Sequence, residues 1–371
     1  MISTTGAPQR KLHGLFLNPA QANCSIYESG RMVYECLLLS EKYEIDYLEI
    51  SASQRNINDN YDFYAFNYHH ATMGWLHTKS ISRLPGLKLT FVLETLRNDP
   101  FVLCPRDAFD IYCALDPTMR VADKRVYAFP RPLEQIHAIA TYEEEKIPVI
   151  GSFGFATPGK GFELVVDAVN KEFDKAVIRI NIPPGTHADS ATYKIHNRDY
   201  AKYLSDLCKS VAKEGVEVVI TRDYMTKEEL IQWCSQNTLN CFLYDRNQPG
   251  LSATTDQAIS SGRPLAVSDN ETFRHIHSYL TPYPSRSLRE SIVLSQLEVE
   301  QMQVAWTPQN FAAKFEEVLE KTGCSSLSCS PSIDEATQAR TITLRRKTRL
   351  SSTRIVRKLK SLVQGTRTRR K

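Results

Sequence analysis

The sequence lacks the features that define several large classes of protein. No run reaches the roughly 18 apolar residues that a membrane-spanning helix needs, and residues 1–11 lack the apolar core of a secretory signal peptide. The nine cysteines include no Cys-x-x-Cys pair, and several lie inside apolar runs. We therefore expect free thiols and a cytoplasmic protein, without a disulfide framework or a zinc site.

Acidic residues are absent from the C-terminal segment 340–371, which holds 13 lysines and arginines. The whole chain has 46 Lys and Arg against 42 Asp and Glu, which leaves 33 basic and 42 acidic residues in 1–339, a net charge of −9. The protein is therefore expected to be an acidic body with a basic tail. An acidic body without a recognition motif does not favour nucleic acid as a partner.

The length of 371 residues and the hydrophobic content of 42% are enough for two domains with real cores. Short apolar runs alternate with helical patterns, which is typical of parallel sheets covered on both faces. In the first half, strands are expected at 12–18, 45–50, 62–68, 88–94, 111–115 and 125–129, with a helix at 29–40. In the second half, strands are expected at 148–153, 176–182, 216–221, 240–244 and 264–268, with helices at 162–173, 200–214, 227–236 and 253–260.

This twofold βα alternation predicts the α/β class, with two doubly wound Rossmann-like domains facing each other across a cleft. We expect an N-terminal domain over residues 1–140 and a C-terminal domain over residues 147–290. Closing helices are expected over 291–322, including a capped amphipathic helix at 307–321. Residues 323–371 are expected to form a linker and the basic tail.

A glycine-rich loop follows the first strand of the second half. Residues 154–161 read Gly-Phe-Ala-Thr-Pro-Gly-Lys-Gly and precede a helix. This arrangement places backbone N–H groups around a site that Lys160 also reaches, and such a site favours an anion such as a diphosphate. It is not a Walker loop, because Gly161 follows the lysine, and no Gly-x-Gly-x-x-Gly pattern occurs here. A surface turn with a solvated lysine is the alternative.

A second segment with the same character begins at Gly250. Leu251 and Ser252 follow it at the head of a helix, where free amides favour a phosphate. Asp256 lies in the first turn of that helix or just after it, where its carboxylate could accept from a ribose hydroxyl. We expect this segment and the loop containing Gly154 and Lys160 to converge on one nucleotide diphosphate.

These two segments resemble the donor domain of retaining glycosyltransferases with the two-Rossmann GT-B fold, close to glycosyltransferase family 4 (glycosyl transferases group 1). Residues 154–161 resemble that family's Gly-Arg-x-x-x-x-Lys-Gly loop, and residues 250–269 resemble its Gly-Leu…Glu-Ala-x-x-x-Gly-x-Pro-Val-x-x-Ser-Asp stretch. The resemblance covers residues 147–276, with a looser match before them. The chain diverges at Phe155, which stands where the family has a phosphate-binding arginine, and Lys160 remains as the basic residue of that pair.

Two glutamates of the family, eight positions apart, are also missing. Counting back from Gly262 puts Gln257 and Pro249 in their places, and a shift by one residue puts Asp256 and Gln248 there. We prefer the shifted register, because Asp256 could then bind the ribose and Gln248 a sugar hydroxyl at the catalytic centre.

Candidate residues of the first domain follow two of its strands. Ser25 lies between the first strand and its helix, where the resemblance places the acceptor and the donor phosphates. His69 and His70 follow a buried strand and could bond a sugar hydroxyl or transfer a proton near neutral pH. Glu94 ends another strand and is a second acceptor-side candidate.

Structural alternatives exist for these residues. The two histidines could cap the next helix, and Glu94 could be a carboxylate at the rim of the cleft. A zinc site made by His69, His70 and His77 is not favoured, because no carboxylate or cysteine is spaced close by in the sequence. Arg274, His275 and His277 are expected on a solvated face.

The resemblance implies a glycosyltransferase, hexosyltransferase-like, that moves a sugar from a nucleotide-diphospho-sugar to a glycan or glycolipid acceptor in polysaccharide biosynthesis. The N-terminal domain would bind the acceptor and the C-terminal domain the nucleotide sugar. Retention at the anomeric carbon is implied, and the strand-like segments contain no Asp-x-Asp pattern, so neither a metal nor a cofactor is expected. A catalytically inactive GT-B-like protein that binds a glycan or a partner, and a nucleotide-sugar epimerase, are the alternatives.

The basic tail suggests a further partner. Ile355, Leu359 and Leu362 lie along one helical stripe, with lysines and arginines elsewhere on the helix. A basic amphipathic segment of this kind suits an anionic membrane surface, so a peripheral position on the inner face of a membrane is expected through residues 340–371. A solvated tail is the alternative.

Overall fold

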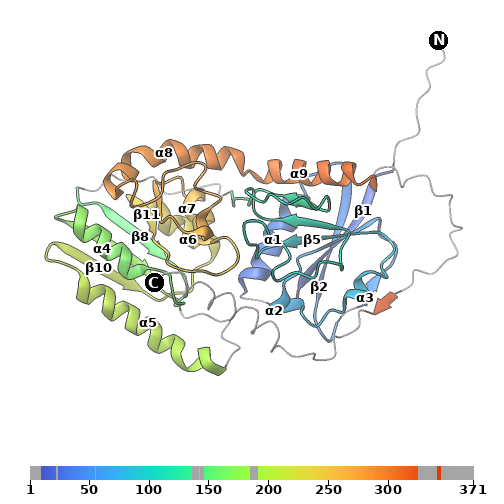
Figure 1. Cartoon of the computed structure of the whole chain (residues 1–371), viewed down its shortest axis with the longest axis horizontal. Helices are drawn as coiled ribbons and strands as arrows, with labels where there is room; N and C mark the ends of the chain where they lie inside the picture. Colours follow the sequence, from blue (N-terminus) through green and yellow to red (C-terminus); the bar gives the residue numbers. More distant parts are fainter. Residues whose placement is uncertain are drawn as a thin grey trace, which may run out of the picture.

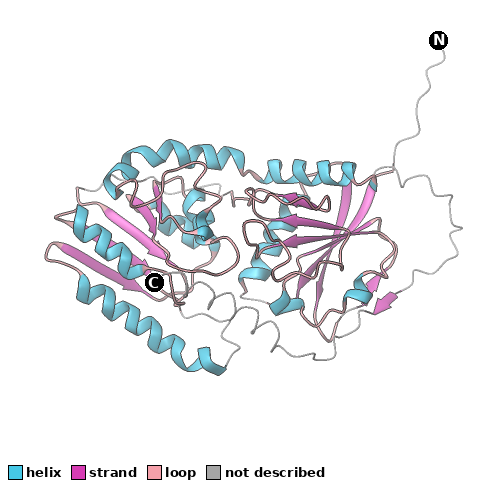
Figure 2. Cartoon of the chain, in the orientation of Figure 1, coloured by secondary structure: helices cyan, strands magenta, loops and turns pink. Residues whose placement is uncertain are grey.

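The computed structural model describes residues 10–21, 24–54, 56–135, 142, 146–183, 191–324 and 341–343. Two parallel β-sheets, each with its own helices, lie next to each other along the long axis of the molecule (Figures 1 and 2). The α/β class and the two doubly wound domains expected from the sequence are confirmed.

The first sheet has six parallel strands in the order β2-β1-β4-β5-β6-β7. In β4, Phe63 and Ala65 face one core while Tyr64 and Phe66 face the other, because successive side chains of a strand point to opposite faces. The strand order reverses between β1 and β4, so the loops after these two strands lie at the topological switch point. The strands are β1 (Leu12–Pro19), β2 (Tyr43–Ile50), β4 (Phe63–Phe66), β5 (Leu87–Val92), β6 (Ile111–Ala114) and β7 (Val126–Ala128).

The second sheet has five parallel strands in the order β10-β9-β8-β11-β12. Its order reverses between β8 and β11, and the loops after these strands are the two segments singled out in the sequence. The strands are β8 (Val149–Phe153), β9 (Ala176–Asn181), β10 (Val216–Thr221), β11 (Leu239–Phe242) and β12 (Leu265–Val267).

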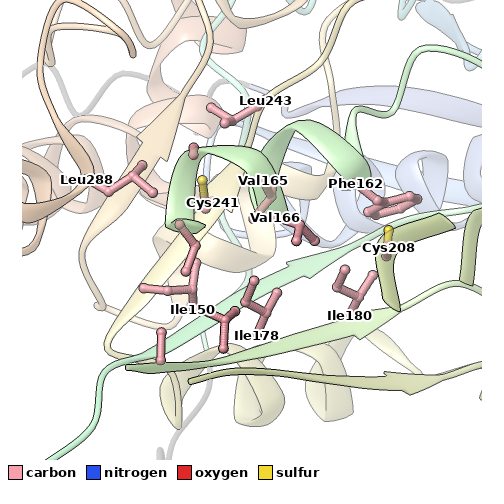
Figure 3. Close-up of a cluster of buried hydrophobic side chains, with 14 of the residues drawn as sticks. Ile150, Phe162, Val165, Val166, Ile178, Ile180, Cys208, Cys241, Leu243 and Leu288 are labelled. Carbon is pink, nitrogen blue, oxygen red and sulfur yellow. The ribbon is translucent and has the colours of Figure 1, made fainter. Parts of the chain in front are cut away.

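Helices cover both faces of each sheet. Figure 3 shows one of these cores, where Val165 and Val166 of α4 lie over Ile178 and Ile180 of β9. This burial is the main stabilising contribution of such layers. The helices are α1 (Ser25–Leu37), α2 (His70–Met73), α3 (Thr78–Ile81), α4 (Phe162–Glu172), α5 (Ala191–Val211), α6 (Lys227–Ser235), α7 (Thr254–Ser260) and the short 3₁₀ helix η1 (Glu271–Phe273).

The predicted closing helices are divided between the two domains. α8 (Leu288–Ala305) and α9 (Pro308–Lys321) follow one another along one side of the molecule (Figure 1). Val299 and Met302 of α8 pack in the core of the second domain. Phe311 and Phe315 of α9 stack on Phe91 of β5, each with ring centroids 5.9 Å apart, so α9 completes a core of the first domain.

The end of the chain adds a short strand that the sequence did not predict. β13 (Thr341–Thr343) pairs antiparallel with β3 (Asn56–Asn58), at the beginning of the segment 340–371 that was expected to be the basic tail. The stripe of Ile355, Leu359 and Leu362, expected to bind a membrane, lies outside the described residues. Within the described part of the chain no helix is long and apolar enough to cross a bilayer.

The described cysteines match the expectation of free thiols. Eight of them are buried and none of these eight forms a disulfide; Cys329 lies outside the described residues. Burial raises the pKa of several of these thiols, which disfavours the reactive thiolate. Their role in the described structure is to pack in the cores.

Buried ion pairs join the two domains. Arg274 donates to Asp116 at 2.6 and 3.0 Å and to the Thr95 hydroxyl at 2.9 Å. Arg274 and His275 are therefore buried, and the prediction that they lie on a solvated face is wrong. The physical reason is that η1 turns these side chains into the contact between the domains, where a carboxylate from the first domain compensates the arginine charge. His277 is partly buried, and its Nε2 lies 3.2 Å from the Ser268 carbonyl.

Candidate functional site

A cavity of about 270 Å³ lies between the two domains, at the carboxyl ends of β8 and β11. Residues at the start of α1 line it from the first domain, and the loops after the second-domain strands line it from the other side. Open α/β sheets bind ligands in the crevice at such a switch point. The lining includes Ser25, Glu28, Ser29, Met32, Phe153, Gly154, Phe155, Lys160, Pro183, Tyr224, Met225, Lys227, Arg246, Leu251, Ser252, Thr254, Asp256 and Gln257.

The glycine-rich loop after β8 packs directly against the chain that leaves β11. Gly159 and Gly161 have φ of +79° and +64°, which L side chains rarely adopt. A Cβ on Gly161 would lie 1.9 Å from the Leu243 carbonyl oxygen, and one on Gly159 would lie 2.5 Å from that of Asp245. The Asp245 amide also donates to the Gly159 carbonyl at 3.0 Å. Glycine at these positions therefore lets the two predicted loops come together.

Lys160 and Ser252 lie on the same wall of the cavity and are linked by two further hydroxyls. The Lys160 ammonium donates to the Tyr244 hydroxyl at 2.8 Å, and this hydroxyl lies 3.0 Å from the Thr254 hydroxyl. The Thr254 hydroxyl in turn lies 2.8 Å from that of Ser252. The arrangement joins one buried cation and three hydroxyl groups in a single chain of contacts, and the charged and hydroxyl donors in it suit a phosphate.

The same ammonium changes the acidity of Tyr244. Burial would raise the pKa of this phenol, but the positive charge of Lys160 and the hydrogen bonds from Lys160, Ser252 and Thr254 lower it below its ordinary value. The group of four residues therefore favours negative charge at this wall of the cavity.

The predicted amide donors are not free. The amide of Gly154 donates to the Asn181 carbonyl at 3.1 Å, and that of Ser252 to the Thr272 carbonyl at 3.0 Å. The amide of Gly250 donates at 2.8 Å to the carbonyl of Thr95, and Gly250 does not line the cavity. The expectation that these amides bind a phosphate is corrected, because the tight turns around them use the N–H groups to join neighbouring strands and the two domains. Leu251, the remaining predicted residue of this segment, lines the cavity.

Asp256 lines the cavity but already has a partner. The Arg131 guanidinium donates to both of its carboxylate oxygens, at 2.5 to 3.0 Å, and both side chains are buried. Burial raises the pKa of Asp256, and the charge of Arg131 opposes that rise. A ribose hydroxyl would therefore share this carboxylate with Arg131.

The two residues from the alternative registers of the missing glutamates are placed differently. Gln257 lines the cavity. Gln248 is exposed, lies outside the lining, and accepts from Arg246 at 2.8 Å. The catalytic role predicted for Gln248 stays a prediction.

His69, His70 and Glu94 form a compact cluster outside the lining of the cavity, although 24 to 25 positions separate the histidines from the glutamate. His69 Nε2 lies 3.1 Å from a Glu94 oxygen and His70 Nδ1 lies 3.9 Å from the same oxygen. His69 is also the N-cap of α2, because its Nδ1 accepts from the Ala71 amide at 3.1 Å. A nitrogen that accepts cannot carry the proton, so His69 carries it on Nε2 and donates to Glu94. The capping interpretation is therefore confirmed for His69, and its predicted role in the cleft stays a prediction.

The cluster is also a possible set of metal ligands. Among the described residues, the ligand atoms of His69, His70 and Glu94 lie within 4.8 Å of one another. A metal at His69 Nε2 would have to displace the proton that this nitrogen carries, and Nδ1 cannot take it up while it accepts from Ala71. The donor set therefore fits a hydrogen-bonded His–Glu pair better than a metal centre.

Charge and burial act in opposite directions on Glu94. Burial would raise its pKa, but the hydrogen bond from His69 and the electrostatic interactions with His69, His70 and Arg246 lower it overall. The structure therefore favours an ionised Glu94 that orients His69. Gly250, at the start of the segment that leads into α7, lies against this cluster, because a Cβ there would lie 3.4 Å from Glu94 Cγ.

We predict that His70 is neutral at neutral pH. Burial and the neighbouring His69 lower the pKa of His70 below 6.5, against the opposing charge of Glu94. Because the folded protein disfavours the imidazolium, the unfolded chain takes up this proton first, and the stability contributed by neutral His70 is lost as the pH falls below about 6.5. In an NMR titration, the ring signal that disappears in His70→Gln should have a midpoint below 6.5. A midpoint at or above that value would contradict this prediction.

Several residues of the site were not singled out in the sequence. Lys227 lines the cavity and pairs with Glu134 at 3.6 Å. Arg246 also lines the cavity, from the loop after β11. Tyr244 connects Lys160 to Thr254. The strand-like run 240–244 predicts that Tyr244 is buried but does not indicate a role for its hydroxyl. A single charged residue in a polar loop has no periodicity from which its direction could be inferred.

No protein-family model matches the chain, and no curated protein matches it. Solved structures do share its architecture. The Anabaena protein Alr3699/HepE, in its complex with UDP-glucose, is 11% identical with a TM-score of 0.56, and the match covers 84% of this chain and all of that one. A glycosyltransferase from Rickettsia africae ESF-5 is 9% identical with a TM-score of 0.55, over 87% of this chain and all of that one. These likenesses confirm the two-domain GT-B fold.

Proposed function

We propose that this protein is a glycosyltransferase that moves a sugar from a nucleotide-diphospho-sugar to a glycan or glycolipid acceptor. The observation that carries the proposal is the interdomain cavity lined by Lys160, Ser252 and Thr254, which the Tyr244 hydroxyl connects behind the lining. The UDP and UDP-glucose complexes of Alr3699/HepE, a protein of the same fold, support it.

In this mechanism the diphosphate is the leaving group. Lys160 and the hydroxyls of Ser252 and Thr254 would stabilise the charge that develops on it, inside a partly closed site where fixed dipoles act strongly. The apolar part of the cavity, which includes Pro183, Tyr224 and Met225, would take the nucleobase.

The His69–Glu94 pair would act on the acceptor side. Glu94 keeps the proton of His69 on Nε2, so that a hydroxyl could exchange a proton with the pair once the acceptor displaces their mutual hydrogen bond. Retention at the anomeric carbon and independence of metal belong to this proposal through the resemblance to family 4. Attachment to an anionic membrane through residues 340–371 remains part of the proposal as well.

The first test of the proposed function is whether the protein binds a nucleotide sugar. A thermal-shift screen against UDP-, GDP-, ADP- and dTDP-sugars should find one donor that stabilises the protein. Transfer to an added glycan with release of the free nucleotide would then support the enzyme. Binding without release would favour the inactive glycan-binding or partner-binding protein, and a change in the donor sugar without acceptor would favour the epimerase.

We predict that Lys160→Ala weakens the binding of this nucleotide by about 1.5–3 kcal/mol, which is the scale of a hydrogen bond to a charged group. The ammonium is buried at the cavity wall, so solvent would screen its interaction with a bound phosphate only weakly. Isothermal titration calorimetry measures the change. Lys171→Ala removes an exposed charge from the last turn of α4 and serves as the control. Equal affinities of the wild type and Lys160→Ala would exclude Lys160 from the site.

A further inference from the structure

Arg246 lies where the two loops of the donor side meet. It follows Asp245, whose amide is hydrogen-bonded to the Gly159 carbonyl at 3.0 Å, and its own carbonyl accepts from the Asn270 side chain at 3.0 Å. The backbone on both sides of Arg246 is therefore held in place. Its side chain lines the same cavity as Lys160.

The guanidinium of Arg246 has a donor to spare. One Nη donates to Gln248 at 2.8 Å, while the buried Nε has no hydrogen-bond partner among the residues that the structure describes. Buried donors are normally paired, and leaving one unpaired costs about 1–3 kcal/mol. An acceptor that enters the cavity would satisfy this group.

The other cations that line the cavity, Lys160 and Lys227, already have partners, although each ammonium keeps further N–H groups. Lys160 donates to Tyr244, and Lys227 donates to the Glu28 carbonyl at 3.2 Å and pairs with Glu134. A guanidinium has a planar set of N–H groups that matches phosphate oxygens, whereas an ammonium acts as a point charge. Arg246 therefore has both the geometry and the free capacity to bind a phosphate.

We propose that Arg246 and Lys160 bind the donor diphosphate together from two different loops, and that Arg246 supplies the guanidinium that position 155, a phenylalanine, lacks. This inference rests on the proposed function, since it assigns a residue to the same site. The guanidinium then follows β11, whereas position 155 follows β8. It lies near Glu94, and the charge of Arg246 is one of the causes that lower the pKa of that carboxylate.

The test uses the full chain with UDP and with inorganic pyrophosphate, which binds without any choice of nucleobase. Arg246→Met keeps the apolar stem and removes the charge, and we expect it to lower the affinity for pyrophosphate by about tenfold to a hundredfold. Arg246→Lys keeps the charge without the planar group and should lose less. Arg289→Met, which removes an exposed arginine at the start of α8, should bind as the wild type does.

The outcomes separate the two proposals. Wild-type protein that binds pyrophosphate but none of the nucleotide sugars would overturn the proposed function, and the pyrophosphate affinities alone would then decide the role of Arg246. Equal affinities of the wild type and Arg246→Met would overturn this inference while the proposed function stands. If Arg246→Met fails to fold, as judged by circular dichroism, Arg246→Lys decides: an affinity equal to that of the wild type overturns the requirement for a guanidinium. Wild-type protein that binds neither probe overturns both.

Discussion

Replacing Arg131 with methionine is expected to lower the free energy of unfolding by about 3–5 kcal/mol, the range measured when one partner of a buried ion pair is removed. The guanidinium of Arg131 is the partner that the structure shows for both oxygens of Asp256, and both side chains are buried. Without it a carboxylate stays buried with no compensating charge. Urea denaturation at neutral pH measures the loss.

The pH dependence gives this prediction a second readout. Burial raises the pKa of Asp256, and removal of Arg131 takes away the main effect that opposes the rise, which leaves only the smaller effect of Lys227. A protonated carboxyl needs no counter-charge, so the deficit of Arg131→Met should narrow as the pH falls. Arg31→Met removes an exposed partner of Glu35 and should cost less than about 1 kcal/mol. A loss no larger than that of Arg31→Met would contradict the importance of the buried pair.

Replacing His69 with asparagine is expected to lower kcat of the proposed transfer by about 10²–10⁴, the contribution of a positioned acid or base. Asparagine is a good N-cap, so this variant keeps an acceptor for the first turn of α2. It removes the Nε2 that donates to Glu94. Initial rates with saturating donor and acceptor measure the effect, and calorimetry should find the donor affinity unchanged.

The fold offers a matched control for His69. His77 is the N-cap of α3 and accepts from the Lys79 amide at 3.1 Å in the same manner, without an ion pair to Glu94. His77→Asn should therefore retain full turnover. Equal turnover of His69→Asn and His77→Asn, with donor binding intact, would restrict His69 to its capping role.

Much of the candidate site in the second domain could be predicted from local patterns in the sequence. The run from Gly154 to Gly161 and the segment after Gly250 were recognisable because glycines, a lysine and a helix start follow apolar strands. Parallel strands bring their carboxyl ends to one edge, so placing both segments at the switch point between β8 and β11 required only the βα alternation. The positions of Lys160 and Ser252 on one wall agree with that reasoning.

Other features depended on contacts that no local pattern encodes. The amides of Gly154, Gly250 and Ser252 were expected to be free, yet each donates to a carbonyl of another segment. No local pattern predicts that Glu94 lies with the histidines, although the fold brings its carboxylate to 3.1 Å from His69 Nε2. Arg246 carries no periodic signal, and its exposure to the cavity follows from the contact of its loop with Gly159.

By itself the sequence determined the class of fold, the presence of two sheets and the location of the two glycine-containing loops, because hydrophobic periodicity and glycine positions act over a few residues. Only the tertiary structure decided which charges are compensated. Arg131 meets Asp256 over a separation of 125 residues, and Arg274 meets Asp116 over 158. The strength of such pairs depends on burial between the two domains, which arises only after both sheets have formed and docked.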